Sequence, residues 1–425
     1  MQKTTIISII PLLVFVALFL GSGLYFGNFY SLPAPIIALF SVVVALLIYR
    51  APMKEKIGLF FKGAGDSNVL QMCMIALLAG AFASVANALG STHSIVNMGM
   101  YYISPEYFPV GIFIIASFLS FATGTSVGTI MTLSPIVFDL ATQSQSNTAL
   151  IGASLLSGAM FGDNLSLISD TTIAATQSVG CQMNQKMKAN AKIAIPMAIL
   201  AVIILLFIGN PDAENHLHNQ LYSDFNAVLI LPYVAVVVIA LFGVNVFVSL
   251  FLGILISGVI GFTYGKFHFL QFATDIHKGF MGMADTFFLY FIIGGLAFLV
   301  EHFGGIRFLM NLITQRIKSG SSALLGMGFL VTVADVCVAN NTVAILIASK
   351  TSKTIAEQFK IPLRSVASVL DIFSCYAQGL IPYGAQVIAL YKFADTIDYP
   401  QLVMYAIYLH LLLIGTLGYI YVGKK

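Results

Sequence analysis

Long apolar runs recur along this chain from Ile6 to Val422, and each is long enough to cross a lipid bilayer as a helix. The runs dominate the composition: of 425 residues, 59% are hydrophobic and only 9% are charged. A soluble domain carries about 25% charged residues. The chain is therefore predicted to be an all-α polytopic membrane protein. The first run, 6–26, is too long for a signal peptide and lacks a small-residue cleavage site, so we expect a retained span.

Ten of the apolar runs predict simple crossings separated by charged loops. They are residues 6–26, 33–50, 69–90, 150–178, 192–209, 226–243, 246–264, 285–303, 366–392 and 400–422. Two longer segments, 108–143 and 322–350, are each interrupted midway by small polar residues. Each of these two is either one broken span or a re-entrant hairpin.

The distribution of basic residues favours hairpins. If both long segments return to the side they left, nearly all of the 20 Lys and Arg fall on one side, including the loop Arg50–Lys62, Lys186 and the loop Arg307–Lys318. The exceptions are Lys266, Lys278 and Lys392. The positive-inside rule makes that side the cytoplasm and places the acidic loop 210–225 outside. We therefore expect both termini in the cytoplasm and the chain in a bacterial inner membrane.

Short motifs repeat at offsets of 214 to 216 residues, as in Ala153-Ser154-x-Leu156 with Ala367-Ser368-x-Leu370 and Lys62-Gly63 with Lys278-Gly279. Residues 1–210 and 226–425 are therefore predicted to be two repeats. Each holds five crossings, one hairpin (108–143 or 322–350) and one broken helix (150–178 or 366–392). An odd number of crossings inverts the second repeat, an arrangement typical of secondary transporters that alternate access around a central site.

The hairpin interruptions carry Thr125 and Ser126 in the first half, and Asn340, Asn341 and Thr342 in the second. Small hydroxyl and amide residues let a helix break and offer neutral oxygens suited to dehydrated Na⁺, while the helix N-termini favour an anion beside it. Close packing between helices is the alternative role for such small residues.

Asp163 lies midway along the first broken helix, followed by Asn164 and Ser166. An ionisable group at membrane depth is costly unless paired or hydrated, so it marks a functional site. Asp163 is predicted to bind Na⁺, or a proton in competition with it, the alternative being a cap on the broken helix. Asp170 fits either a coupling carboxylate or an N-cap.

Four further residues are candidates for proton or substrate coupling. Asp335 and Asp371 lie within spans and are either proton-relay or substrate-ammonium partners, or paired structural groups. Gln378 and Tyr383 lie within the second broken helix, where Gly379, Pro382 and Gly384 interrupt the span.

Two stretches match a known signature. They are Phe121-Ala122-Thr123-Gly124-Thr125-Ser126-x-Gly128-Thr129 and Ser157-Gly158-x-x-Phe161-Gly162-Asp163-x-Leu165-Ser166-x-x-Ser169-Asp170-Thr171-Thr172. The sequence resembles the NhaC-type sodium/proton antiporter family of the ion-transporter superfamily over most of its length. The resemblance implies inverted repeats with re-entrant hairpins. It also implies a cation site near Thr125, Ser126, Asp163 and Asn164, with a symmetry mate near Asn340, Asn341 and Thr342.

These observations predict a secondary active transporter, with Na⁺/H⁺ antiport by alternating access as the first hypothesis. Because the family also contains amino-acid and organic-acid carriers, a Na⁺- or H⁺-coupled carrier of such a substrate is the alternative. We expect no enzyme, since no nucleophile–base or metal-ligand spacing is present. Na⁺ and H⁺ are the expected ions, without a cofactor or nucleic acid, in contact with the lipid bilayer; a homodimer is left open.

Overall fold

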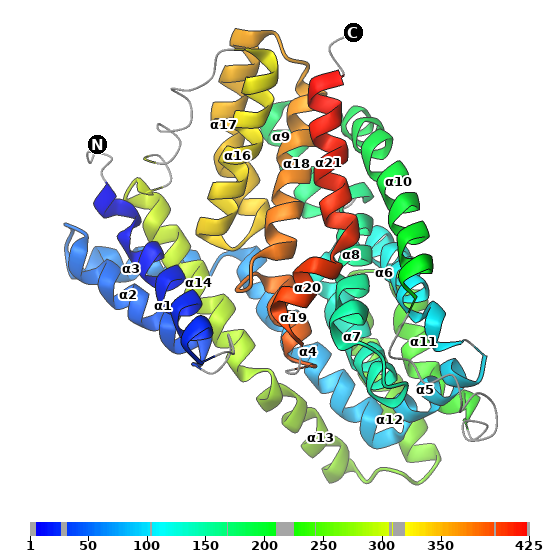
Figure 1. The fold of residues 1–425 in the computed structure, drawn as a ribbon. Coiled ribbons are helices and arrows are strands. Elements are labelled where there is room, and N and C mark those ends of the chain that lie inside the picture. Colours follow the sequence, from blue (N-terminus) through cyan, green and yellow to red (C-terminus); the bar gives the residue numbers. More distant parts are fainter. Residues whose placement is uncertain are drawn as a thin grey trace.

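The computed structural model describes residues 6–26, 32–102, 104–167, 169–209, 225–242, 244–305, 308, 319–394 and 397–422, and every regular element in these ranges is a helix (Figure 1). The predicted loops 210–225 and Arg307–Lys318 fall almost entirely outside the described residues. The all-helical class predicted from composition is therefore confirmed for the described part of the chain.

The first half runs from η1 to α10. Its elements are η1 (Ile6–Ile9), α1 (Ile10–Phe26), α2 (Ala34–Ile48), α3 (Met53–Ala64), α4 (Ser67–Leu89), α5 (Ser91–Tyr102), η2 (Pro105–Tyr107), α6 (Phe108–Thr123), α7 (Ser126–Gln143), α8 (Thr148–Leu165), α9 (Asp170–Val179) and α10 (Met183–Ile208).

The second half begins at α11. Its elements are α11 (Ala227–Leu241), α12 (Val246–Thr263), α13 (Phe269–Gly282), α14 (Ala284–His302), α16 (Gly320–Val338), α17 (Asn341–Phe359), α18 (Leu363–Leu380), α19 (Ala385–Tyr391), α20 (Tyr399–Tyr405) and α21 (Ile407–Val422).

Both long segments divide where the sequence predicted. The first breaks between Thr123 and Ser126, and the second between Val338 and Asn341. α16 and α17 pack side by side, as Figure 1 shows, and α6 and α7 both pack against α8. Six described helices are long and apolar enough to cross a bilayer, or seven if the bent pair α20 and α21 is one span. Ten crossings and two hairpins therefore stay a prediction.

Several helix boundaries next to the breaks correspond at one separation in the two halves. The left-handed residues that end α6 and α16 are Gly124 and Ala339, 215 positions apart. The same separation joins the first residues of α8 and α18, the last residues of those helices, and the first residues of α9 and α19. The division into two repeats at residues 1–210 and 226–425, and their inverted orientation, stay predictions.

Helices also exchange across the halves. α3 packs against α14, and its counterpart α13 packs against α4. Equivalent glycines make these contacts: a Cβ on Gly63 would lie 2.6 Å from the Gly294 carbonyl oxygen, and one on Gly279 would lie 2.4 Å from that of Gly80. The backbones therefore touch directly, as helices in a membrane do when small residues line their interface.

Large apolar side chains cover much of the outer surface. Leu47 of α2, Phe207 of α10 and Val259 of α12 are 76%, 87% and 63% exposed. Exposed apolar surface on this scale is unusual for a soluble monomer and marks a surface that meets lipid or a partner. The outer helices α2, α10 and α12 are thus built to contact hydrocarbon.

Candidate functional site

Two helix breaks form the tips of the interrupted segments. Gly124, in the left-handed region with φ 69°, ends α6, and the Thr125 side chain accepts a hydrogen bond from the Gly128 N–H to cap α7. In the other half Ala339 is left-handed with φ 49°, and the Asn340 side chain accepts from the Val343 N–H. Both tips thus end one helix and cap the next with a polar side chain.

Two further breaks divide the predicted broken helices. α8 ends at Leu165 and α9 begins at Asp170, while α18 ends at Leu380 and α19 begins at Ala385. Ser169 occupies the N-cap position of α9, so Asp170 is its first residue and not the cap. Asp163 therefore lies in the last turn of α8, just before its break.

Close packing fixes the position of Asp163. Gly158 and Gly162 stand four residues apart on α8, and a Cβ on either would come within 2.3 Å of a backbone oxygen of α6, from Phe113 or Ser117 respectively. Only glycine permits this approach. As a result Asp163 is held against the tip that follows α6.

One chain of hydrogen bonds joins all four breaks. Ser126 Oγ donates to Asp163 Oδ2 (2.8 Å), and Gln386 Nε2 donates to Ser126 Oγ (3.0 Å). Gln378 Nε2 in turn donates to Gln386 Oε1 (3.0 Å) and to the Ala339 carbonyl oxygen (3.1 Å). The chain therefore runs from the first broken helix through the first tip and the second broken helix to the second tip.

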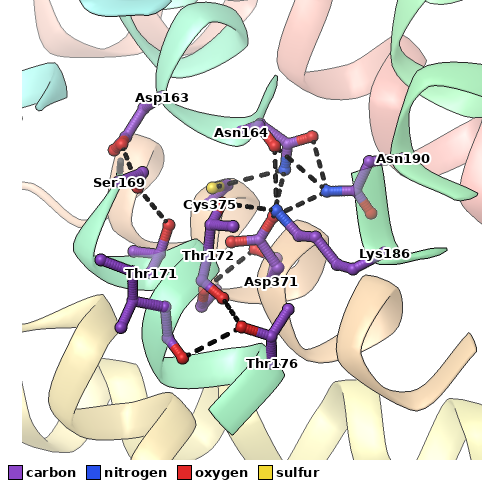
Figure 2. Close-up of polar contacts among 12 residues, drawn as sticks. Asp163, Asn164, Ser169, Thr171, Thr172, Thr176, Lys186, Asn190, Asp371 and Cys375 are labelled. Carbon is purple, nitrogen blue, oxygen red and sulfur yellow. Dashed lines mark hydrogen bonds and ion pairs between the residues drawn. The ribbon is translucent and has the colours of Figure 1, made fainter. Parts of the chain in front are cut away.

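The other carboxylate oxygen of Asp163 is also bound. Ser169 Oγ donates to Asp163 Oδ1 (2.6 Å), and Thr171 Oγ1 lies 2.9 Å from Ser169 Oγ, as Figure 2 shows. Asp163 is only 4% exposed and no ion pair to it is found among the described residues. Its partners are hydroxyl groups, which stabilise a carboxylate and whose oxygens are also suitable Na⁺ ligands.

A cavity of about 160 Å³ opens beside Asp163. Seven predicted residues line it: Thr125, Ser126, Asp163, Asp170, Asn340, Asn341 and Thr342. Further polar groups come from Ser169 and Thr171, which belong to the signature stretch, and from Gln71, Asn245 and Gln386, which were not predicted as site residues. The lining contains two carboxylates and no Lys, Arg or His, so its fixed side-chain charge favours a cation.

The remaining predicted residues lie away from this cavity. They are Asn164, Ser166, Asp335, Asp371, Gln378 and Tyr383. Gln378 belongs to the hydrogen-bond chain described above, and the Tyr383 hydroxyl donates to the Val336 carbonyl oxygen (2.9 Å). Ser166 is buried just after α8 ends. In the described structure these six residues therefore do not line the cavity and would not touch a ligand bound in it.

Asn164 faces a second polar cluster, centred on a buried ion pair (Figure 2). Lys186 Nζ lies 2.6 Å from Asp371 Oδ2, and both side chains are fully buried. Lys186 Nζ also donates to the Asn164 carbonyl oxygen (3.0 Å) and to Thr172 Oγ1 (2.7 Å). The three ammonium donors are thereby used, and the interpretation of Asp371 as a paired structural group fits this geometry.

The placement of Lys186 corrects the sequence prediction, which put it in a cytoplasmic loop. α10 begins at Met183, nine residues before the predicted span, so Lys186 lies in its first turn and points inward. Asn190, one turn later on the same face, donates to Asp371 Oδ2 (2.7 Å) and to Asn164 Oδ1 (3.1 Å). The i, i+4 spacing of Lys186 and Asn190 was the available signal, hidden by the basic residues around it.

Asp163 has a neutral counterpart. The 215-residue separation pairs Asp163 with Gln378, and Ser126 with Asn341. Gln378 is 1% exposed, and its Oε1 has no hydrogen-bond partner in the described residues. The two halves are thus alike in backbone but unlike in charge at this position.

A comparison with known families agrees with this arrangement. The model of the Na⁺/H⁺ antiporter family matches residues 1–210 and 218–424. The chain belongs to the Na⁺/H⁺ antiporter family. The predicted NhaC-type membership is thereby confirmed, and with it a multi-pass membrane transporter family.

Individual relatives are distant but similar over most of their length. The malate-2H⁺/Na⁺-lactate antiporter of Bacillus subtilis (strain 168) is 23% identical over 90% of this chain and 88% of its own. The Na⁺/H⁺ antiporter NhaC of Alkalihalophilus pseudofirmus is 25% identical over 83% of this chain and 82% of its own. Among solved structures, the Alcanivorax borkumensis YdaH transporter aligns over 97% of this chain and 98% of its own, with a TM-score of 0.43 and 14% identity.

Proposed function

We propose that this protein exchanges Na⁺ for H⁺ across a bacterial inner membrane, and that Asp163 is the carboxylate that binds either ion. The observation that carries the proposal is the position of Asp163: a buried carboxylate, held by two hydroxyls, beside a polar cavity without basic side chains. A carboxylate in such surroundings needs a cation or a proton to offset its burial. Competition of the two ions for one carboxylate couples their transport.

The ligands for Na⁺ would come from the carboxylate and the neighbouring oxygens. Asp163 near the end of α8, Ser126 at the start of α7 and Ser169 before α9 supply oxygens, and Thr125 and Thr171 line the same cavity. Among the described residues no group of three or more His, Cys, Asp or Glu is placed to hold a metal ion. This donor set, rich in hydroxyls, is suited to a hard monovalent cation rather than to a transition metal.

Alternating access follows from the way the halves meet. The four breaks come from two tips and two broken helices, and the hydrogen-bond chain from Asp163 to Ala339 spans both halves. Movement of either tip would break this chain and open the cavity to one side. We propose that the halves are inverted repeats and that both termini are cytoplasmic.

Reconstituted vesicles test the proposal directly. Vesicles with an acidic interior should lose their pH gradient when Na⁺ is added outside. Asp163→Asn should abolish the response, because the neutral amide has no negative charge to balance Na⁺ and does not take up a proton. Asp398→Asn is the matched control, since Asp398 is exposed and makes no side-chain cap bond. Full Na⁺-driven proton movement in Asp163→Asn would reject the proposal.

A second candidate is Na⁺- or H⁺-coupled carriage of a small organic acid or amino acid. The cavity has a volume of about 160 Å³. One water molecule needs only about 10–15 Å³, so the cavity has room for a larger solute. The N-terminal residues of α7 and α17 also line it, and helix N-termini favour carboxylates. The same vesicles distinguish the candidates: a response to Na⁺ that requires added malate, lactate or an amino-acid mixture supports the second.

A further inference from the structure

Asp335 differs from the other buried carboxylates of the described residues. Asp163 receives two hydroxyl donors, Asp371 is paired with Lys186, and Asp275 is paired with Lys278. Asp335 is 0% exposed, and neither of its carboxylate oxygens has a hydrogen-bond partner in the described part of the chain. A carboxylate in that position is uncompensated unless something neutralises it.

A metal cation is not suited to this position. Na⁺ needs several oxygen ligands, whereas the neighbours of Asp335 along α16 are Val331, Ala334, Val336, Cys337 and Val338, and no hydrogen-bonding group of the described residues reaches its carboxylate. The Thr332 hydroxyl, one turn earlier, is also buried and has no hydrogen-bond partner in the described residues. It is the one hydroxyl on α16 within a turn of Asp335. A proton needs no such ligand shell, so it is the simplest species that neutralises this group.

Among the described residues, no charged neighbour offers an alternative. The helices packed against α16 are α14, α17, α18 and α21. Their titratable groups are Asp285, Tyr290, Glu301 and His302; Lys350, Lys353 and Glu357; Arg364, Asp371, Cys375 and Tyr376; and Tyr408, His410, Tyr419 and Tyr421. None bonds to the Asp335 carboxylate. The nearby Tyr383 hydroxyl donates to the Val336 carbonyl oxygen and not to Asp335.

Asp335 is nevertheless tied to the candidate site. Its carbonyl oxygen accepts the N–H of Ala339 (2.7 Å), which forms the second tip, and the Ala339 carbonyl oxygen accepts from Gln378. Gln378 leads through Gln386 and Ser126 to Asp163. A movement of the second tip would therefore change the surroundings of Asp335 and the hydrogen bonds at Asp163 together.

We propose that Asp335 is a second proton-carrying site, separate from the cation site at Asp163, and that the protein therefore moves more than one proton for each Na⁺. This inference rests on the proposed function. In the conformation of the structure Asp335 holds its proton as a carboxylic acid. The proton passes to water on one side when the second tip moves, and the resulting carboxylate is reprotonated from the other side.

The charge balance makes the proposal measurable. Exchange of one proton for one Na⁺ moves no net charge, whereas a further proton makes each cycle move one positive charge, so that a membrane voltage alters the exchange. Wild-type exchange should respond to a K⁺-valinomycin voltage in reconstituted vesicles. Asp335→Asn mimics the neutral acid but cannot release a proton, so it should still exchange Na⁺ for H⁺ and lose the voltage response.

Two further variants make the experiment decisive. Asp335→Glu keeps a carboxyl group and should keep the voltage response. If Asp335 had a purely structural role, the voltage response would not require a carboxyl group at this position. Asp398→Asn, at an exposed carboxylate, should also keep it. Size-exclusion profiles establish that each variant is folded.

Three results separate the possible failures. Electroneutral exchange in the wild type overturns this inference and leaves the proposed function standing, without need of any variant. A voltage response that persists in Asp335→Asn also overturns it. Absence of Na⁺-driven proton movement in the wild type instead overturns the proposed function itself.

Discussion

At the scale of single residues, the two halves differ in what they place at one backbone position. Asp163 and Gln378 both lie two residues before the end of α8 or α18, but one is a carboxylate and the other an amide. The Gln378 amide bridges Gln386 and the Ala339 carbonyl oxygen. One half thus carries the charge that can bind an ion, and the other supplies a neutral amide that holds its own tip at Ala339.

Ser169→Ala should weaken Na⁺ binding at neutral pH by about tenfold or more. The Ser169 hydroxyl donates to Asp163 Oδ1, and a hydrogen bond to a charged group contributes about 1.5–3 kcal/mol. Without it the proton competes more effectively for the carboxylate, so half-maximal exchange needs more Na⁺. Ser178→Ala on the same helix is the control, since Ser178 donates to the Ala174 carbonyl oxygen. Equal Na⁺ dependence in the two variants would contradict this role for Ser169.

At the scale of helices, glycine contacts set the distance between α6 and α8. Gly162→Ala should destabilise the protein by about 1–3 kcal/mol, the usual cost of overpacking, because its Cβ would lie 2.3 Å from the Ser117 carbonyl oxygen. Gly111→Ala on α6 is the matched control, since a Cβ there meets nothing within 4 Å. Thermal unfolding in detergent compares the two. A Gly162→Ala protein as stable as Gly111→Ala would refute the close approach.

The buried ion pair between Lys186 and Asp371 joins α10 to α18, and Lys186 also donates to the Asn164 carbonyl oxygen near the end of α8. Lys186→Met or Asp371→Leu alone should each lower stability by about 3–5 kcal/mol, because the partner charge remains buried and unpaired. The double variant Lys186→Met/Asp371→Leu should recover most of this loss. Thermal unfolding of all four proteins gives the coupling between the two changes. Additive losses in the double variant would mean that the two side chains do not act as a pair.

The sequence predicted the breaks well and the ion pair poorly, for physical reasons. Helix breaks are local: the Gly124–Thr125 and Asn340 interruptions contain the residues that end one helix and cap the next. The helices α3 and α13 were missed because they are short, carry charged residues, and read as loops between apolar runs. Lys186 was missed because its pairing with Asp371 depends on tertiary contact across 185 positions, which no local pattern encodes.

At the scale of the whole molecule, the predicted orientation remains to be measured. A single cysteine at Lys266 should react with an impermeant maleimide added outside the cell, and one at Lys360 only after the membrane is opened. Both side chains are exposed, so accessibility depends on the side of the membrane and not on burial. Cys181, the half-buried native cysteine, is replaced by Ser in this background. Labelling of Lys360→Cys from outside would overturn the positive-inside assignment.

The reciprocal packing of α3 on α14 and α13 on α4 suggests which parts move together. These pairs cross between the halves through glycines in backbone contact, so they form one continuous unit. Between the halves, the second broken helix reaches the first tip through the side chains of Gln386 and Ser126, and both tips line the cavity. We expect the tips and broken helices to move against this unit, because hydrogen bonds through side chains are more easily exchanged than close backbone contacts.

The central claim is that Asp163 binds Na⁺ in competition with a proton. Calorimetric Na⁺ titration of the purified protein across a range of pH tests it most directly, because it needs no transport cycle. We predict that wild-type Na⁺ affinity falls as pH falls, that binding releases protons to the buffer, and that Asp163→Asn binds no Na⁺ at any pH. Na⁺ binding to Asp163→Asn with wild-type affinity, or wild-type binding that does not change with pH, would contradict the account.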